Sequence, residues 1–234
     1  MLVRDIMDTD PGRVQADSPL SEVVSLFKEK GKRIVLVERK GKLAGVVGHR
    51  DLGRAAPRGA SAFSVGDVFY AADHARAADV MTRDPVCVHY AYTVEEAARV
   101  IMETDVPAAP VRDNTPRAVG VIDRRELFKT LIALTGVNRG GIQIAFCPDD
   151  RPGSIKQIAD LVRRYGGRMI SILTKEAAGR ENRREVYMRM HSLDRRRLSR
   201  MKQELAALVT LRYIVDYDEN QRELFDEEKK PPEK

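Results

Sequence analysis

The sequence has no tryptophan, two cysteines and four histidines, and aromatic residues make up only 6% of its 234 residues. Cys87 and Cys147 are too few for a disulfide framework or a cysteine-rich metal cluster. Both lie in apolar stretches, which favours buried thiols. The histidines are far apart and lack ligand spacing, so the sequence predicts neither a metal site nor histidine-based catalysis.

Long apolar runs are also missing. No segment approaches the roughly 18 apolar residues of a membrane span, and the N-terminus has no signal-peptide core. The nucleophile elbow, the P-loop and the dinucleotide-binding glycine motif are all absent from the sequence. We therefore expect a soluble cytoplasmic protein with no membrane partner that is not an enzyme.

The chain does contain many charges and a moderate share of apolar residues. Hydrophobic residues make up 43% of the chain, which is enough for packed cores, and charged residues make up 32%, which implies that the cores are small. Subtracting 35 acidic from 41 basic residues leaves a net charge of +6, which suits anionic ligands. Several small modules are favoured over one large enzyme core.

An internal repeat is the most informative pattern. The tripeptide Asp5-Ile6-Met7 recurs as Asp79-Val80-Met81, an offset of 79 − 5 = 74 residues. In each copy an amphipathic helix follows, and then two short strands, the second of which runs into a helix. The predicted strands cover 34–37 and 43–47 in the first copy, and 108–111 and 118–122 in the second. The repeat is thus a β-α-β-β-α unit.

One such unit cannot cover its own sheet. Two copies related by a pseudo-two-fold axis should therefore bury their sheets against each other and leave symmetry-related clefts. After residue 136 the pattern changes to strand 142–146, helix 155–165, strands 169–173 and 185–190, a helix containing Leu198 to Leu208, and strand 211–217. This is the ferredoxin-like βαββαβ order.

The predicted fold class is therefore α+β, with two repeats followed by a ferredoxin-like domain. The predicted divisions are repeat 1 at 1–56, a helical connector at 57–77, repeat 2 at 78–136, the C-terminal domain at 137–218, and a charged disordered tail at 219–234.

The two repeats, with the motifs DIM and DVM at their starts and GVVGHRDL and GVIDRREL at their ends, resemble a tandem pair of CBS domains. The segment 149–174 resembles an ACT domain, a small-molecule-binding module. The order of the modules is similar to the acetoin-utilisation protein B group of bacterial CBS-ACT proteins. The resemblance implies a homodimer that needs no cofactor. It also implies that the CBS clefts bind an adenine-type nucleotide such as AMP, ADP, ATP or S-adenosylmethionine, and that an amino acid or other small carboxylate binds at the ACT domain.

In CBS pairs, the resemblance implies a Ser or Thr hydroxyl that holds phosphate and an Asp three residues later that holds the ribose. The first repeat has Gly48 and Asp51 at these positions. Gly48 offers only its backbone, and we expect His49 and Arg50 to compensate in part. Asp51 has an alternative role as a first-turn carboxylate that the helix dipole favours.

In the second repeat the corresponding residues are Asp123 and Glu126. They also form an Asp-x-x-Glu capping box, which is a sufficient structural role for both. A phosphate beside Asp123 would meet like charge unless Arg124 or Arg125 neutralises it. The first cleft is therefore the stronger candidate.

The C-terminal candidates are Asp150, Arg151, Pro152 and Gly153, which form a turn before a helix, and Arg168. Free N–H groups at a helix start favour a carboxylate, and Pro and Gly suit the turn. Arg168 stands where the family has Asn and supplies donors only, which suits a carboxylate or phosphate. The alternative is an ordinary turn and an exposed arginine.

A dense arginine run extends from Arg180 to Arg200. Acidic residues interleave with it and no aromatic stacking pattern accompanies it, so we expect a solvated or oligomer-facing surface rather than a nucleic-acid site. The sequence thus predicts a regulatory sensor that acts on an unknown protein partner. The alternative is a scaffold whose clefts bind nothing, with the arginine-rich face contacting a protein or nucleic acid.

Overall fold

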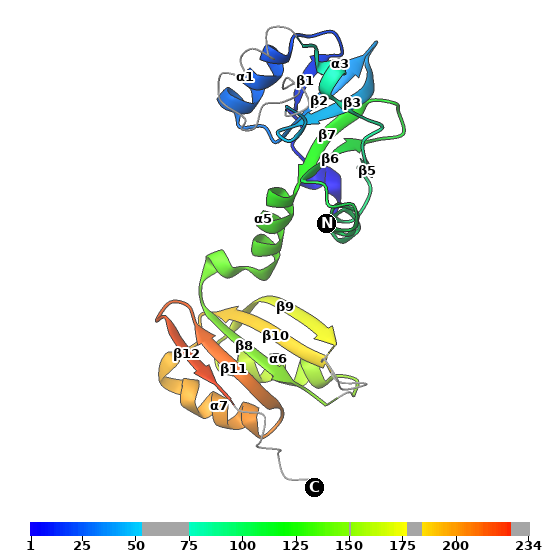
Figure 1. Cartoon of the computed structure of the whole chain (residues 1–234). Coiled ribbons are helices and arrows are strands. Elements are labelled where there is room, and N and C mark those ends of the chain that lie inside the picture. The colour runs from blue at the N-terminus through cyan, green and yellow to red at the C-terminus, as the bar shows by residue number, and fades with distance from the viewer. Residues whose placement is uncertain (53–74, 150, 177–183, 226–234) are drawn as a thin grey trace. The chain divides into compact units, whose positions relative to one another are not determined.

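The computed structural model describes residues 1–52, 75–149, 151–176 and 184–225, which form α+β structure (Figure 1). The chain divides into two compact units, Met1–Thr130 and Leu131–Lys234. The predicted helical connector lies outside the described residues except at 75–77. Within the described residues, no helix has the length and apolar character needed to cross a membrane.

The first unit contains two copies of the predicted repeat. Its elements in chain order are η1 (Val3–Asp5), β1 (Gly12–Gln15), α1 (Leu20–Lys30), β2 (Ile34–Arg39), β3 (Lys42–Gly48), α3 (Ala77–Val80), β4 (Thr82–Arg83), β5 (Val88–His89), α4 (Val94–Glu103), β6 (Ala108–Arg112), β7 (Ala118–Asp123) and α5 (Arg124–Thr135), the last of which extends into the second unit.

The strand registers confirm the internal repeat. In each copy a short strand pairs in parallel with the next strand, which in turn pairs in antiparallel with the last. Ile34 lies opposite Gly48 in the first copy, and Ala108 lies opposite Asp123 in the second. Even the irregularity in register after Val37 recurs after Val111, 74 residues later.

The two copies exchange their first segments. Thr82, at the start of the second copy, pairs with Val46 of the first, and Asp8, at the start of the first copy, bridges to Val121 of the second. The sheets also bury apolar side chains together, as predicted. This shared cluster contains Ile34, Leu36, Ala108, Ala118 and Val121.

The second unit has the predicted βαββαβ order. Its elements are η3 (Val137–Arg139), β8 (Ile142–Cys147), α6 (Ser154–Arg164), β9 (Arg168–Glu176), β10 (Arg184–His191), η4 (Arg195–Arg197), α7 (Leu198–Ala206), β11 (Thr210–Asp216) and β12 (Gln221–Leu224). The strand order is β12-β11-β8-β10-β9. The predicted ferredoxin-like arrangement is confirmed, with one added edge strand.

The added strand corrects the prediction of a disordered tail. We expected that tail to begin at 219, but Gln221–Leu224 pairs with β11 in antiparallel. The segment is charged, and all four of its residues are exposed, so its sequence resembles a tail. Backbone hydrogen bonds to the free edge of β11 place it in the sheet.

The two faces of this sheet differ. On one face the helices α6 and α7 cover a core that includes Ile144, Phe146 and Met188 (Figure 1). On the other face, the register aligns one side chain from each strand in a single row across the sheet: Leu173, Tyr187, Ala145, Tyr213 and Leu224. We call this the open face.

The end of α5 is attached to this open face. The carbonyl oxygen of Thr135 accepts hydrogen bonds from Ser171 Oγ (2.9 Å) and Arg189 Nε (3.0 Å). Gly136 has a φ of +67°, and a Cβ there would lie 2.2 Å from Ile170. The chain therefore needs glycine at this position in order to pass so close to the sheet.

Candidate functional site

The first unit holds two clefts at equivalent positions in the repeat. The first has a volume of about 670 Å³, and all four residues predicted for it line it: Gly48, His49, Arg50 and Asp51. The second has a volume of about 340 Å³, and Asp123 and Glu126 line it. The segment Gly31 to Ile34 and the side chain of Arg125 line both clefts.

Asp51 is the central polar group of the first cleft. The chain leaves β3 at Gly48, and the following turn brings Asp51 back so that its Oδ2 accepts the backbone N–H of Gly48 at 2.8 Å. Its Oδ1 accepts the hydroxyl of Thr82 at 3.1 Å. Thr82 belongs to the second repeat, so this carboxylate is held by groups from both copies.

The remaining lining of the first cleft combines cations, the acids Asp84 and Asp105, and apolar side chains. The ring of His49 stacks on Phe27 with 4.3 Å between ring centroids. The hydrogen bond and charge of Arg124 hold the pKa of the Asp105 carboxyl below its usual value, and the charge of Arg50 adds to this effect. Apolar side chains complete the walls: Ile34, Val46, Val86, Pro85, Val106, Pro107 and Ala108.

The acidic side chains that line the second cleft are already paired. Asp123 Oδ1 accepts the backbone N–H of Glu126 at 2.9 Å, which is one half of the predicted capping box. Asp123 Oδ2 lies 3.2 Å from Arg33 Nε. Glu126 pairs instead with Lys129 at 2.7 Å. The carboxylates therefore have structural partners of their own.

Arg124 was named from the sequence, but it lines neither cleft. Its guanidinium lies 2.6 Å from Asp105 Oδ1. The cation that neutralises Asp123 is Arg33, from the first repeat. Sequence spacing did not indicate Arg33, because the contact depends on how the two repeats pack.

Thr82 is a residue of the first cleft that the sequence reasoning missed. A signal for it was present, because Thr82 follows Met81 just as Asp8 follows Met7 in the first copy. The two clefts therefore differ at three equivalent positions. The first has Gly48, Asp51 and Thr82, whereas the second has three acids at the corresponding places: Asp123, Glu126 and Asp8.

Comparison with known proteins bears on this unit. Residues 3–58 and 77–133 match the family model for the CBS domain. These two segments coincide with the two copies of the repeat. The first unit is a CBS domain pair.

Three known proteins are similar to part of the chain. A CBS domain-containing protein of Dictyostelium discoideum is 26% identical over 133 residues, which are 56% of this chain and 92% of that protein. The crystal structure of the Arabidopsis thaliana protein CBSX2 in complex with AMP is 22% identical and covers 57% of this chain and 97% of its own, with a TM-score of 0.48. A Vibrio cholerae protein described as a putative acetoin utilization protein, AcuB, is 23% identical and covers 59% and 96%, with a TM-score of 0.49.

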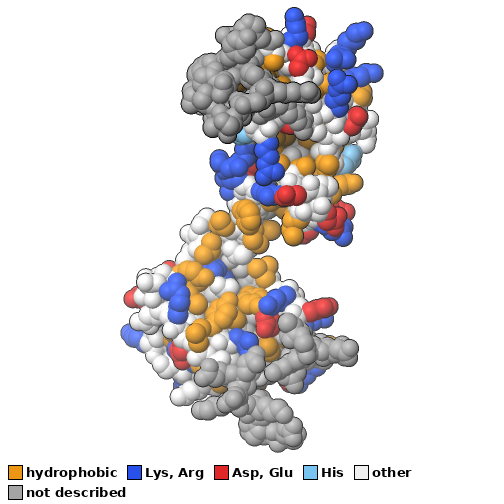
Figure 2. All heavy atoms as spheres, viewed as in Figure 1, with side chains coloured by type: hydrophobic (Ala, Val, Ile, Leu, Met, Phe, Trp, Pro, Cys, Tyr) orange, Lys and Arg blue, Asp and Glu red, His pale blue; other side chains and the backbone are white. Residues whose placement is uncertain are grey.

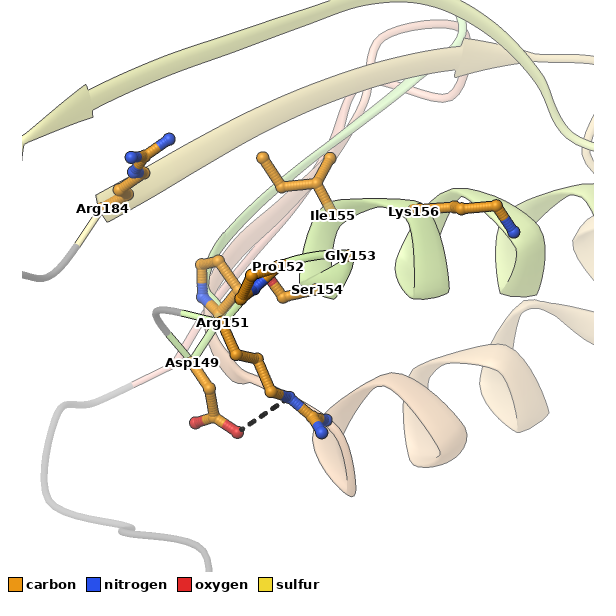
Figure 3. A pocket seen from close by; sticks show the side chains of 9 residues that line it. Asp149, Arg151, Pro152, Gly153, Ser154, Ile155, Lys156 and Arg184 are labelled. Atoms are coloured by element: carbon orange, nitrogen blue, oxygen red, sulfur yellow. Dashed lines mark ion pairs between the residues drawn. The ribbon is translucent and has the colours of Figure 1, made fainter.

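The second unit has a separate pocket beside the start of α6, with a volume of about 550 Å³ (Figure 3). Arg151, Pro152 and Gly153 line it, together with Lys156 and Arg184. Asp150 lies outside the described residues. Gly153 has a φ of +85° at the N-cap of α6, a conformation that favours glycine. Pro152 precedes this N-cap and does not occupy the first helical position.

Arg168 does not join this pocket within one chain. It begins β9, four residues after α6 ends, and pairs in register with His191. An 11-residue helix is roughly 16 Å long, so Arg168 lies one helix length away from the turn. Arg184, the first residue of β10, lines the pocket in place of Arg168.

Several arginines of this run form ion pairs with acidic residues of the same chain. Arg195 lies 2.8 Å from Asp216 and 2.7 Å from Asp218, and Arg196 lies 3.3 Å from Asp194. Arg189 is only 3% exposed. Arg180 and Arg183 lie outside the described residues. Among the described residues, no group of three or more His, Cys, Asp or Glu side chains is arranged to hold a metal ion.

Proposed function

We propose that this protein is a non-enzymatic regulatory protein that binds an adenine-type nucleotide in the first cleft of its CBS pair. The observation that carries the proposal is the Asp51 carboxylate, which is held at the end of β3 by the Gly48 N–H and the Thr82 hydroxyl. A carboxylate placed in this way is suited to accept two ribose hydroxyl hydrogen bonds.

The rest of the cleft supports the same ligand class. Its volume of about 670 Å³ is in the range of small-molecule sites. The apolar wall suits a purine base. The cations Arg50 and Arg125 suit phosphate. Lys32 and Arg33 also line the cleft, but they are paired with Asp8 and Asp123.

A ligand in this cleft would touch both repeats. Asp51 comes from the first copy, and Thr82 and Ala108 come from the second. A ligand that fits one arrangement of the copies better than another shifts the population toward that arrangement. This population shift is the proposed basis for signalling to a protein partner.

The test is calorimetric titration with AMP, ADP, ATP and S-adenosylmethionine, supported by thermal unfolding. Asp51→Asn keeps the size of the side chain and one acceptor, and Glu126→Gln at the equivalent position of the second cleft is the matched control. We expect Asp51→Asn to weaken binding by at least about tenfold and Glu126→Gln to change it by less than about threefold. Ligand at about 100 times its dissociation constant should add about 2.7 kcal/mol to the stability.

The alternative function is a scaffold whose clefts bind nothing. The internal pairing of Asp123 with Arg33 and of Glu126 with Lys129 favours it for the second cleft. A flat titration with every nucleotide would make this the leading function of the whole pair. Salt-sensitive binding of RNA by the same protein would extend the scaffold function to nucleic acid.

The pocket at the start of α6 is the proposed effector site of an ACT-like domain. Arg151, Lys156 and Arg184 surround it, and free N–H groups at the start of α6 favour an anion. The proposed effector is an amino acid or another small carboxylate. Arg184→Gln should abolish a thermal shift caused by the effector, with Arg222→Gln on the exposed strand β12 as the control. A thermal shift that Arg184→Gln leaves intact would place the effector elsewhere.

A further inference from the structure

One side chain connects the two clefts of the first unit. Arg33 lines both clefts, and its Nε lies 3.2 Å from Asp123 Oδ2 at the end of β7. Its backbone lies at the end of the other strand, since a Cβ on Gly48 would be 4.0 Å from the Arg33 carbonyl oxygen. Arg33 therefore reaches from the end of β3, in the first cleft, to the end of β7, in the second.

This ion pair breaks the symmetry of the repeat. In the strand registers, Arg33 directly precedes the residue that lies opposite Gly48. Pro107 directly precedes the residue that lies opposite Asp123, so Pro107 is the equivalent of Arg33 in the second copy. The partners that correspond to the ion pair are thus Pro107 and Gly48, and neither carries a charge. The connection exists in one direction only, from the first cleft to Asp123.

The guanidinium of Arg33 is accessible to a second anion. The side chain of Arg33 is 46% exposed, whereas that of Asp123 is 15% exposed. An ion pair with an exposed partner is weak, so an anion in the first cleft can compete for the guanidinium. Arginine has five N–H donors and binds phosphate in bidentate geometry. Figure 2 shows Lys and Arg side chains gathered on the first unit beside the start of α5.

Asp123 connects this contact to the start of α5. Its Oδ1 accepts the backbone N–H of Glu126 in the first turn of the helix, and its Oδ2 faces Arg33. If Arg33 moves to another anion, Asp123 loses its counter-ion. The charge in the second cleft and the hydrogen bond at the start of α5 then both change.

We propose that Arg33 senses phosphate in the first cleft: it leaves Asp123 for the phosphate of a bound adenine nucleotide, and Asp123 passes the change to the second cleft and to α5. Repulsion between phosphate and Asp123 favours this exchange over sharing of the guanidinium. The inference rests on the proposed nucleotide site and adds how that site recognises phosphate. Because coupling between sites is reciprocal, weakening the contact of Asp123 with Arg33 must tighten the binding of phosphate.

The test is calorimetric titration of the full chain with AMP and with adenosine, which differ only in the phosphate. The dissociation constant of adenosine divided by that of AMP measures what the phosphate contributes. Arg33→Gln should lower this ratio by at least about threefold, because it removes charge-assisted hydrogen bonds to phosphate. Arg33→Lys keeps the charge and should restore most of the ratio.

Asp123→Asn should have the opposite effect. It should tighten AMP binding by about two- to fivefold, the strength of a weak ion pair, and leave adenosine binding unchanged. Asparagine still accepts the Glu126 N–H, so α5 stays capped. Glu126→Gln is the matched control, because it removes a carboxylate of the same cleft that pairs with Lys129 and not with Arg33. The control should change AMP binding by less than about 1.5-fold.

The double variant Arg33→Gln/Asp123→Asn separates exchange from simple repulsion. Repulsion between Asp123 and phosphate acts through space, so relieving it would tighten AMP binding with or without Arg33. Exchange needs the guanidinium, so Asp123→Asn should lose most of its effect in the Arg33→Gln background. Thermal unfolding of each variant checks that it is folded. Tightening of the same size in both backgrounds would overturn the proposal.

Nuclear magnetic resonance gives a readout at α5 itself. The amide resonance of Glu126, which donates to Asp123, should shift with AMP but not with adenosine, and Arg33→Gln should abolish the shift. A shift that persists without Arg33 would contradict the proposal. If the wild type binds both ligands and Arg33→Gln leaves their ratio unchanged, this inference alone is wrong. A wild type that binds neither ligand would overturn the proposed nucleotide site as well.

Discussion

Thr82 donates its hydroxyl to Asp51 across 3.1 Å and so joins the first strand of one repeat to the turn that ends the other. The contact depends on the exchange of first segments, since β4 pairs with β3 of the preceding copy. The residue at the equivalent position in the other cleft is Asp8, which pairs with Lys32 at 3.0 Å. The pair Thr82 and Asp51 therefore distinguishes the two clefts.

Removing this hydroxyl should destabilise the CBS pair. Thr82→Val keeps the shape of the side chain but removes one hydrogen bond to a partly buried carboxylate. We expect the free energy of unfolding to fall by about 1 kcal/mol, measured by urea denaturation. Thr104→Val removes an exposed hydroxyl that only bonds back to its own helix, so it should change stability less. Equal stability of Thr82→Val and wild type would mean that the contact contributes nothing.

The closeness of the exchanged segments should make two glycines irreplaceable. A Cβ at Gly45 would lie 2.7 Å from the Thr82 carbonyl oxygen, and a Cβ at Gly120 would lie 2.7 Å from that of Asp8. Backbone cannot yield as a flexible side chain does, so each change to Ala should cost about 1–3 kcal/mol. Gly48→Ala is the matched control, because its Cβ would meet its nearest neighbour at 3.5 Å, an ordinary contact. Thermal unfolding that ranks Gly48→Ala as the most damaging would contradict this account.

The second unit should lose stability in acid through Asp216. Arg195 contacts both oxygens of this 5%-exposed carboxylate, at 2.8 and 3.1 Å, and holds its pKa below the usual value. Because the pKa is lower in the folded than in the unfolded state, the stabilisation is fully present above about pH 5. It is lost as the pH falls through the folded-state pKa, below about 3.9.

Asp216→Asn should therefore cost about 2 kcal/mol at pH 7 and much less near pH 3, as measured by urea unfolding at both values. Asp160→Asn is the control, because Asp160 pairs with Lys156 and Arg163 on the exposed face of α6. It should show only a small cost at either pH. A penalty for Asp216→Asn that is the same at both pH values would contradict the proposed linkage.

Arg189 should be essential for docking the end of α5. Its Nε donates to the Thr135 carbonyl, its Nη2 lies 2.9 Å from Gln143, and its guanidinium lies 4.2 Å from the centre of the Tyr217 ring. Arg189→Met should cost about 2–4 kcal/mol, because it removes three hydrogen bonds to partly buried acceptors and a cation from a helix C-terminus. Hydrogen exchange at residues 136–141 should increase. Unchanged exchange there would show that the segment is held by other contacts.

Much of the fold followed from periodicity and repetition. The predicted strand 34–37 appears as Ile34–Arg39, and the predicted helix 155–165 appears as Ser154–Arg164. These elements were predictable because alternation and helical spacing of apolar residues report directly on burial. Strand β12 was not predictable, since three of its four residues are polar and its place depends on backbone pairing with β11.

The residues that line the candidate sites also fall into two groups, those that the sequence predicted and those that it did not. Gly48 to Asp51 all line the first cleft, because they are consecutive residues at the end of one strand. Arg33, Thr82 and Arg184 were missed as site residues, and Arg124 and Arg168 were assigned to sites that they do not line in the described chain. Each of these depends on a contact between segments that are distant in sequence.

The sequence by itself determined the two repeats, the ferredoxin-like order and the strand ends that carry the candidate ligands, because local spacing of apolar residues and turn chemistry specify these features. The tertiary structure decided which side chains meet in each cleft, that Arg33 rather than Arg124 neutralises Asp123, and that five side chains form one apolar row. Those outcomes depend on the exchange of segments and on strand register, which are set by pairing between distant parts of the chain.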